Sequence, residues 1–250
     1  MNEAKYQNEL IEAKDYIEEK HYKNIFCPEC SKAPIHLVKK QIAKPYFSSN
    51  RKDEHEEDCQ YYREFISNEA ILRLVESKSI KDQERLEFLI NSNLDSSIRL
   101  LLKDIKTPLT NATRPIETTP NLSQSNNNKK VYQKENIPRI HIKNLNFDSE
   151  FVNQYAIIYG QAEIIVKTVE KTDPKTQDTY IEKSLSFYHG KGIKFSCFLS
   201  KNQSKYFDET KNYQNAYFAI FGQLLINEFQ EKKYLNLRIK TTKELRIRTV

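Results

Sequence analysis

The chain has 250 residues, a net charge of +6, 15 Tyr and 13 Phe but no Trp, with 38% hydrophobic and 30% charged residues. This aromatic content excludes a disordered chain, and the lack of an apolar run of about 18 residues excludes a membrane-spanning helix. With only four glycines and neither GxGxxG nor GxxxxGK[ST], we do not expect a nucleotide-hydrolysing motor. The charged first 20 residues exclude a secretory signal, and four cysteines without such a signal indicate a cytoplasmic protein rather than a disulfide scaffold.

The basic charge is concentrated towards the C-terminus. Residues 1–105 contain 17 Lys/Arg and 20 Asp/Glu, residues 106–138 contain 5 and 2, and residues 139–250 contain 18 and 12. A basic excess at that end favours a polyanionic partner. The alternative is a Lys-rich composition inherited from an AT-rich bacterial or mobile-element genome, which the abundance of Asn, Ile and Lys also fits.

The N-terminal region is expected to mix helices with short strands. Tyr6, Leu10, Ala13 and Ile17 recur at helical spacing and predict a helix over about 3–20. Short strands are expected at about 24–26 and 34–39, with a possible third near 45–47. Apolar periodicity and helix start signals predict helices at about 60–78, 80–92 and 95–104.

Residues 106–138 are predicted to be a flexible linker. This stretch contains four prolines, a run of Ser, Gln and Asn, and almost no apolar periodicity, so it cannot bury enough surface to offset its ordering entropy. The chain then divides into a zinc-ribbon plus helical domain (1–105), the linker (106–138) and a β-domain (139–250).

The C-terminal region alternates apolar and polar residues with a period of two. Ile193, Phe195, Cys197 and Leu199 share one face of a predicted strand, a pattern typical of half-buried antiparallel strands. Five strands are expected, at about 155–169, 179–189, 192–200, 215–229 and 233–248. The sequence 189–192, His-Gly-Lys-Gly, predicts a tight hairpin turn between the second and the third.

One cysteine and histidine pattern carries specific chemistry. Cys27 and Cys30 form a CxxC motif, and His55 and Cys59 form an HxxxC pair after 24 intervening residues. Three thiolates and one imidazole make a common closed, tetrahedral zinc site, which predicts a structural zinc ion bound by these four residues.

Three alternatives compete with this zinc site. A thioredoxin-type redox CxxC would need a βαβ pattern, which is absent here. The cysteines could be isolated buried thiols, although Cys59 follows a strongly acidic stretch. Another histidine could supply the nitrogen, with His36 as the reserve and His21 also near in sequence.

Residues 20–63 resemble the N-terminal zinc-ribbon of competence protein CoiA-like families. The resemblance is carried by the Cys27–Cys30 motif, the segments 34–38 and 44–47, and the later His55/Cys59 pair, although Tyr46-Phe47-Ser48-Ser49 replaces the histidines of the family's middle segment. It covers under a fifth of the chain. The resemblance implies a setting in DNA metabolism, but the nuclease core of that family is not recognisable here.

The β-domain is expected to be a five-stranded antiparallel OB-like barrel, giving an α+β protein of two domains. Five strands, a short element after the third, and glycines at 160 and 222 fit this fold, with another small barrel or sandwich as the rival. OB folds bind single strands through aromatic and basic side chains on one face and its loops. The residues predicted to bind nucleic acid are Tyr188, Lys191, Lys194, Phe198, Lys201, Lys205, Tyr206, Lys211, Arg238 and Lys240.

Two considerations weigh against assigning all of these side chains to the outer face. Most aromatic residues of a small barrel lie in its core, as expected for Phe187, Phe195 and Phe221, and a register slip of one residue would reverse every outward assignment. Cys197 shares the parity of Ile193 and Phe195, so it is expected to be a buried thiol.

The sequence favours a non-enzymatic protein that binds single-stranded nucleic acid, preferably DNA, with a zinc module for assembly or partner docking. The alternative is a protein-interaction adaptor in a DNA-processing, mobile-element or defence complex. A metal-dependent nuclease is less favoured, because Glu163, Asp173, Asp178 and Glu182 show no paired spacing.

Overall fold

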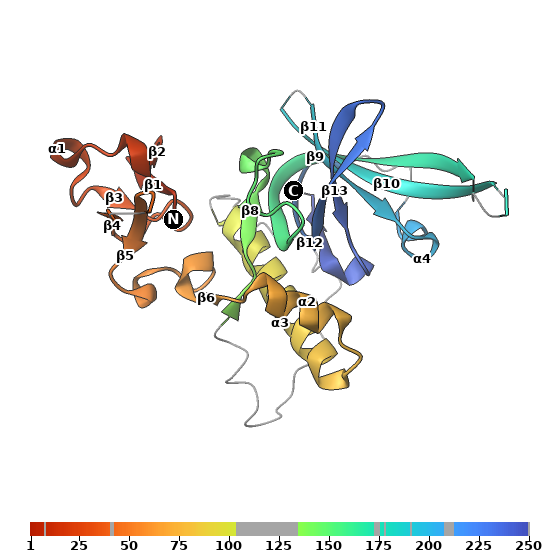
Figure 1. Cartoon of the computed structure of the whole chain (residues 1–250), viewed down its shortest axis with the longest axis horizontal. Coiled ribbons are helices and arrows are strands. Elements are labelled where there is room, and N and C mark those ends of the chain that lie inside the picture. The colour runs from red at the N-terminus through yellow and green to blue at the C-terminus, as the bar shows by residue number, and fades with distance from the viewer. Residues whose placement is uncertain are drawn as a thin grey trace, which may run out of the picture. The chain divides into compact units, whose positions relative to one another are not determined.

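A computed structural model of the protein describes residues 1–7, 9–40, 43–103, 135–172, 176–177, 179–190, 192–207 and 213–249. Contacts divide the chain into two compact units, Met1–Phe65 and Ile66–Val250. Each unit is described by itself (Figure 1). Most of the predicted linker, residues 106–134, lies outside the described residues.

The N-terminal unit combines two small sheets with short helical turns. Strands β1 (Glu3–Tyr6), β2 (Glu9–Glu12) and β3 (Ile25–Phe26) form an antiparallel sheet of order β2-β1-β3, while β4 (Ile35–Val38) pairs with β5 (Tyr46–Ser49). Its other elements are α1 (Glu18–His21), the 3₁₀ turns Ala13–Asp15, Lys52–Glu54 and Gln60–Tyr62, and β6 (Glu64–Phe65). The three strands expected at 24–26, 34–39 and 45–47 are thus confirmed.

The helix expected over 3–20 is wrong. These residues form the β1–β2 hairpin, and Gln7 has a left-handed φ of 53° at its turn. The buried residues are Ala4 and Ala13, whereas Leu10 and Ile17 of the expected helical face are more than half exposed. A helical spacing of four apolar residues therefore did not decide the local structure, because only Ala13 of the four is buried in the core of this unit.

The C-terminal unit is built on a closed ring of five strands. They are β9 (Tyr155–Thr172), β10 (Thr179–His189), β11 (Gly192–Leu199), β12 (Tyr213–Phe229) and β13 (Lys232–Arg238). Neighbours pair in the order β9-β10-β11-β13-β12, and β12 pairs back to β9. The short strands β8 (Arg139–His141) and β14 (Leu245–Arg248) extend the ring at β9 and β12, and α4 (Lys201–Ser204) follows β11.

The chain is therefore α+β and mostly strand, and the strands expected at about 155–169, 179–189, 192–200 and 215–229 are confirmed. Two details differ from the expectation. The β11–β13 pair is parallel, so the ring is not wholly antiparallel. The fifth expected strand ends at Arg238, and the 3₁₀ turn Thr242–Glu244 separates it from β14.

Two helices pack on this ring. Helices α2 (Asn68–Glu76) and α3 (Ile80–Leu102) bury Ile71 and Leu89 in one core with Ile157 and Phe221 of the ring (Figure 1). The contacts thus place residues 66–103 in the same unit as the strand ring. We had expected these residues to form one domain with the zinc-ribbon. An amphipathic stripe predicts that a helix is covered but does not identify what covers it.

The two helices expected at 80–92 and 95–104 form one continuous helix, α3. Its middle contains Asn, Ser and Asp, which usually compete with helical hydrogen bonds. Here Asn93 Nδ2 donates to the Leu89 carbonyl (2.9 Å) and Ser97 Oγ donates to the Asn93 carbonyl (2.8 Å). Asn93 Oδ1 accepts from the Ile137 amide (3.2 Å), so these side chains are satisfied within the helix and by the segment before β8.

Two glycines allow close approaches in the ring. Gly160, with φ +149°, lies in β9, and a Cβ there would come within 2.6 Å of Ile142 Cγ2. A Cβ on Gly222 of β12 would come within 2.5 Å of the Arg238 carbonyl oxygen. Any larger residue at position 160 would displace Ile142, and any larger residue at position 222 would displace the backbone of β13 at Arg238. Packing therefore requires glycine at both positions. Among the described helices, none has both the length and the apolar character needed to cross a bilayer.

Candidate metal centre and outer face of the strand ring

The first half of the metal centre is a knuckle that directly follows β3. The Cys27 amide donates to the Ala33 carbonyl (2.8 Å), and the Ser31 amide donates to the Cys27 carbonyl (2.9 Å). Ser31 has a left-handed φ of 57°, which closes the turn. This backbone holds the sulfurs of Cys27 and Cys30 on the same side.

The second half comes from the loop between two 3₁₀ turns. His55 follows Lys52–Glu54 and Cys59 precedes Gln60–Tyr62, and the Cys59 amide donates to the Glu56 carbonyl (2.9 Å). The halves are tied together by Glu29, whose Oε2 accepts from the Gln60 amide (2.6 Å). All four candidate ligands are buried.

The four candidate ligand atoms all lie within 4.8 Å of one another, and three of the distances between them match the edges of a coordination tetrahedron. Cys27 Sγ lies 3.7 Å from Cys59 Sγ, and His55 Nδ1 lies 3.5 Å from Cys59 Sγ and 3.6 Å from Cys30 Sγ. Metal bonds of about 2.3 Å to sulfur and about 2.0 Å to nitrogen give tetrahedral edges of about 3.8 Å and 3.5 Å. The S–S separation is far too long for a disulfide, and all four cysteines of the chain are free. These four residues could therefore hold a metal ion.

The electrostatics of the cluster call for a cation. Hydrogen bonds from Cys27 and Cys59 hold the pKa of Cys30 well below its usual range, while the hydrogen bond to Cys30 raises the pKa of Cys27 to about 12 and that of Cys59 is raised as well. These opposite pKa shifts arise because the three neighbouring sulfurs compete for the same protons. A metal ion would remove this competition and allow all three sulfurs to be ionised.

The other histidines do not join the cluster. His36 is exposed on β4, so the reserve ligand is not used. His21 is buried, but its Nδ1 accepts from the Ile17 amide (2.9 Å) and its ring packs edge-on against Tyr6. His55 is therefore the histidine that lies within the cluster, as its spacing predicted.

The predicted nucleic-acid residues fall into separate groups in the structure. Tyr188, Lys194, Phe198 and Arg238 lie on the outer face of β10, β11 and β13, and each is adjacent in sequence to at least one core residue: Phe187, Phe195, Cys197 or Leu237. Lys205 and Tyr206 lie in the turn after α4. Lys240 instead donates to the Val75 carbonyl of α2 (2.5 Å), so it is committed to the side that the helices cover. Lys191, Lys211 and the side chain of Lys201 lie outside the described residues.

The register places further side chains on this outer face. On β9 and β10, Lys167 pairs with Ser184, and Ser186 pairs with Ser196 of β11. On β13, Asn236 lies beside Ser196 and Tyr234 is 43% exposed. Lys167, Ser196, Tyr234 and Asn236 were not among the residues predicted to bind nucleic acid. The two-residue period contained the signal for Tyr234 and Asn236, which share the parity of Arg238.

On β11, Phe195, Cys197 and Leu199 are buried as expected, but the inward position expected for Ile193 is wrong: its side chain is 47% exposed, because the β10–β11 register shifts between Phe187 and Tyr188. The expected core positions of Phe187 and Phe221 are confirmed. Phe187 and Phe195 are buried and stacked, with ring centroids 4.3 Å apart, and Phe221 is buried beneath the helices. Cys197 is fully buried, and burial raises the pKa of its thiol to about 12. It is therefore a core residue and not a reactive thiol.

Comparison with known proteins adds no relative to this description: no family model and no curated protein matches the chain. The resemblance of residues 20–63 to the CoiA-like zinc-ribbon stays a prediction.

Proposed function

We propose that the protein binds single-stranded nucleic acid, preferably DNA, on the outer face of its strand ring, and that its N-terminal unit is a structural zinc module. Zinc is favoured because three cysteines and one histidine at tetrahedral distances form a closed site for that ion. Since four protein ligands leave no open position, we assign the ion no catalytic role.

One observation carries the nucleic-acid proposal: the outer face of β10, β11 and β13 joins aromatic rings with cations. Phe198 is 41% exposed and Tyr234 is 43% exposed, while Lys194 and Arg238 lie on the same face. Helices α2 and α3 pack on β9, β12 and β14, on the other side of the ring (Figure 1). Rings offer stacking surfaces to bases and cations neutralise phosphates.

The ring supports an OB-like barrel as the framework for this face. Its five strands close on themselves, β9 pairs with both β10 and β12, and a short helix follows the third strand. Barrels of this kind commonly bind oligonucleotides across their second and third strands, which here are β10 and β11. Fold alone does not set function, so the proposal depends on the side chains.

The test is fluorescence-anisotropy binding of a labelled oligo(dT) 20-mer to the full chain, with the matching duplex and RNA as comparators. We expect binding that weakens steeply with salt and favours the single strand. The double substitution Phe198→Ala/Tyr234→Ala should cost about 1–3 kcal/mol per lost stacking contact. Phe147→Ala, at another exposed ring (45% exposed), is the matched control and should bind normally. If the full chain does not bind at low salt, the proposal is wrong.

A second function, protein docking through the N-terminal unit, is favoured by the exposed apolar side chains of that unit. On the sheet β2-β1-β3, Leu10 and Phe26 both pair with Lys5 and are 55% and 37% exposed. Such a row is typical of contact with another protein. Purification of the chain with a stoichiometric protein partner and without nucleic acid would favour this adaptor role over the first proposal.

A further inference from the structure

The register of the ring orders the outer face into three rows that run across the strands. The turn-side row, nearest the β10–β11 turn, contains Glu163, Tyr188 and Tyr234, together with Ile193, which pairs with Tyr188 after a register shift, and its neighbour Lys194. The small row contains Ser186, Ser196 and Asn236. The α4-side row, nearest helix α4, contains Lys167, Ser184, Phe198 and Arg238.

Three strand pairings and one extension of the register define these rows. Ser184 pairs with Phe198 and Ser186 pairs with Ser196, while Asn236 lies beside Ser196 in the parallel β11–β13 pair. Extending that parallel register by two residues in each direction brings Lys194 beside Tyr234 and Phe198 beside Arg238. Each outer row therefore contributes an exposed ring and a cation on either side of the small row.

The small row forms the floor of a track. The two outer rows lie about 14 Å apart at the backbone, because four residues of a strand separate them. Their long side chains rise above the serines and Asn236 between them and reduce this width. A track of these dimensions has room for one nucleic-acid strand and too little for a base-paired helix.

The charge of the track fits a polyanion. Its cations are Lys167, Lys194 and Arg238, and its one carboxylate is Glu163 at the β9 end of the turn-side row. On β10, β11 and β13 the rows hold no carboxylate, and the nearest acid along β10 is Glu182, which precedes Ser184 by two residues.

A bridge between two side chains covers part of the floor. Lys167 Nζ donates to the Tyr188 hydroxyl (2.8 Å) and lies 5.3 Å from the centre of its ring. The bridge joins the two outer rows across β9 and β10. Ser184 and Ser186, which lie between its ends, are only 4% and 3% exposed.

We propose that a single nucleic-acid strand lies along the small row, across β10, β11 and β13, and that the Lys167–Tyr188 bridge opens to admit it. This inference rests on the proposed function. Phe198 and Tyr234 then stack bases from opposite sides of the track. The opened bridge supplies a further ring from Tyr188 and a cation from Lys167 for a phosphate.

The first test fills the floor. Ser196→Phe should weaken binding of the labelled oligo(dT) 20-mer to the full chain at least 10-fold. The control is Thr179→Phe, which makes a similar change at an exposed position of β10 with the opposite parity, and it should change binding less than twofold. Tyr188→Phe removes the hydroxyl of the bridge and keeps the ring, so it should bind as well as the unmodified protein or more tightly.

A second measurement does not require the track to accept a large side chain. Ser196→Cys and Thr179→Cys are alkylated with iodoacetamide with and without saturating oligo(dT), and each cysteine is read by peptide mass spectrometry. We expect the oligonucleotide to protect position 196 at least fivefold and not position 179. If the chain binds but position 196 is unprotected, or Ser196→Phe binds normally, the track is wrong while the proposed function stands. If the chain does not bind at all, both are wrong.

Discussion

The two units of this chain reach an ordered structure by different means. The core of the N-terminal unit consists of nine buried residues, of which three are the candidate sulfur ligands and three are alanines, leaving Ile25, Ile35 and Phe47 as its large apolar members. The C-terminal unit has two extensive apolar clusters, one inside the ring and one beneath α2 and α3. A segment that buries little apolar surface needs another source of stability, and the tetrahedral cluster is placed to supply it.

Removal of the metal ligands should have the largest effect and should be confined to the N-terminal unit. Binding of a structural zinc ion contributes about 10–16 kcal/mol in small domains, more than a core of this size can supply. We therefore expect Cys59→Ala, or chelation of the unmodified protein, to unfold residues 1–65. Hydrogen exchange should become fast in β1–β5 and stay slow in β9–β13, and elemental analysis should show loss of about one zinc per chain.

The matched control for that experiment is Cys197→Ala, which removes the buried cysteine of the ring. Its metal content should be unchanged. A metal-free N-terminal unit that keeps slow exchange would contradict the comparison between the two units.

Truncation of the ring core should have the next largest effect, with the opposite distribution. Phe187 is fully buried, stacks on Phe195 and lies 4.7 Å from Phe218 between ring centres. Phe187→Ala should lower the free energy of unfolding of the C-terminal unit by about 3–5 kcal/mol. Denaturant titration followed by hydrogen exchange in β10–β12 would measure this loss.

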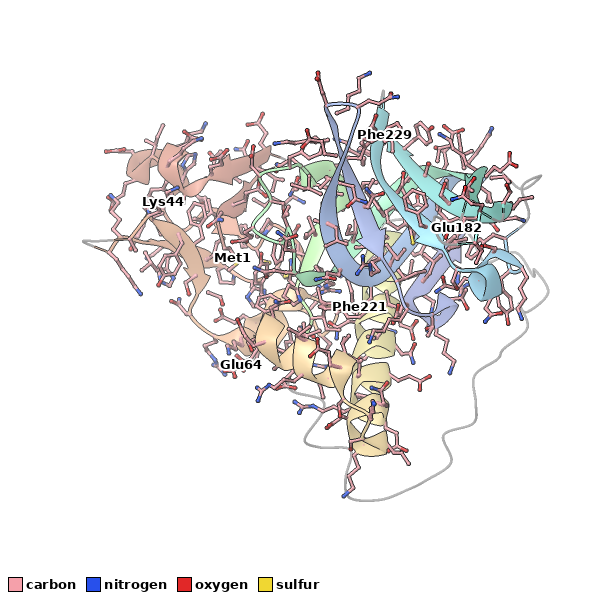
Figure 2. All side chains as sticks on the ribbon, turned by 45° about the vertical axis from the view of Figure 1, so that its right-hand side comes forward. Met1, Lys44, Glu64, Glu182, Phe221 and Phe229 are labelled. Carbon is pink, nitrogen blue, oxygen red and sulfur yellow. The ribbon has the colours of Figure 1, made fainter. Side chains whose placement is uncertain are left out.

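The control is Phe229→Ala at the tip of the β12–β13 hairpin, where the side chain of Phe229 is 65% exposed (Figure 2). It should change the stability by less than about 0.5 kcal/mol. If Phe187→Ala also releases the metal, the two units are not independent.

A smaller effect should appear on acidification of the C-terminal unit. Burial, followed by the charges of Lys143 and His189, lowers the pKa of His141 to about 4, and His141 Nδ1 accepts from the Lys143 amide (3.2 Å). Since the folded pKa lies below the ordinary value of about 6.5, the unfolded state takes up the proton first and stability falls as the pH drops from 6.5 to 4. The loss should be at most about 3 kcal/mol.

His141→Gln should flatten that part of the pH profile, measured as the denaturant midpoint of the C-terminal unit. An NMR titration of the imidazole should give a midpoint near 4 for His141. A titration midpoint for His141 near its ordinary value of about 6.5 would show that its imidazole is hydrated, and it would contradict the expected pH dependence.

The sequence predicted the parts of this structure that depend on short-range chemistry. The spacing of Cys27, Cys30, His55 and Cys59 was sufficient for the metal cluster, because ligand spacing restricts which groups can reach one ion. The two-residue period was sufficient for four strands of the ring, since half-buried strands must alternate.

The parts that the sequence did not predict depend on distant partners. Nothing local indicates that α2 and α3 cover Phe221 of the ring, or that Asn93 is satisfied by the amide of Ile137. The rows on the outer face were also hidden. Lys167 and Tyr188 are 21 residues apart, and only the strand register brings them together.

Strand β9 runs through both halves of the ring: its first part pairs with β12 and its last part pairs with β10. Side chains along β9 point alternately to the interior and to the exterior of the strand ring. Deletion of one residue near Gly160 would therefore reverse the direction of every later side chain in the strand. Point substitutions on its outward side should be tolerated during divergence, whereas changes in its length should not. Lineages carrying this architecture should accumulate insertions in the hairpins and keep the residue count of β9 fixed.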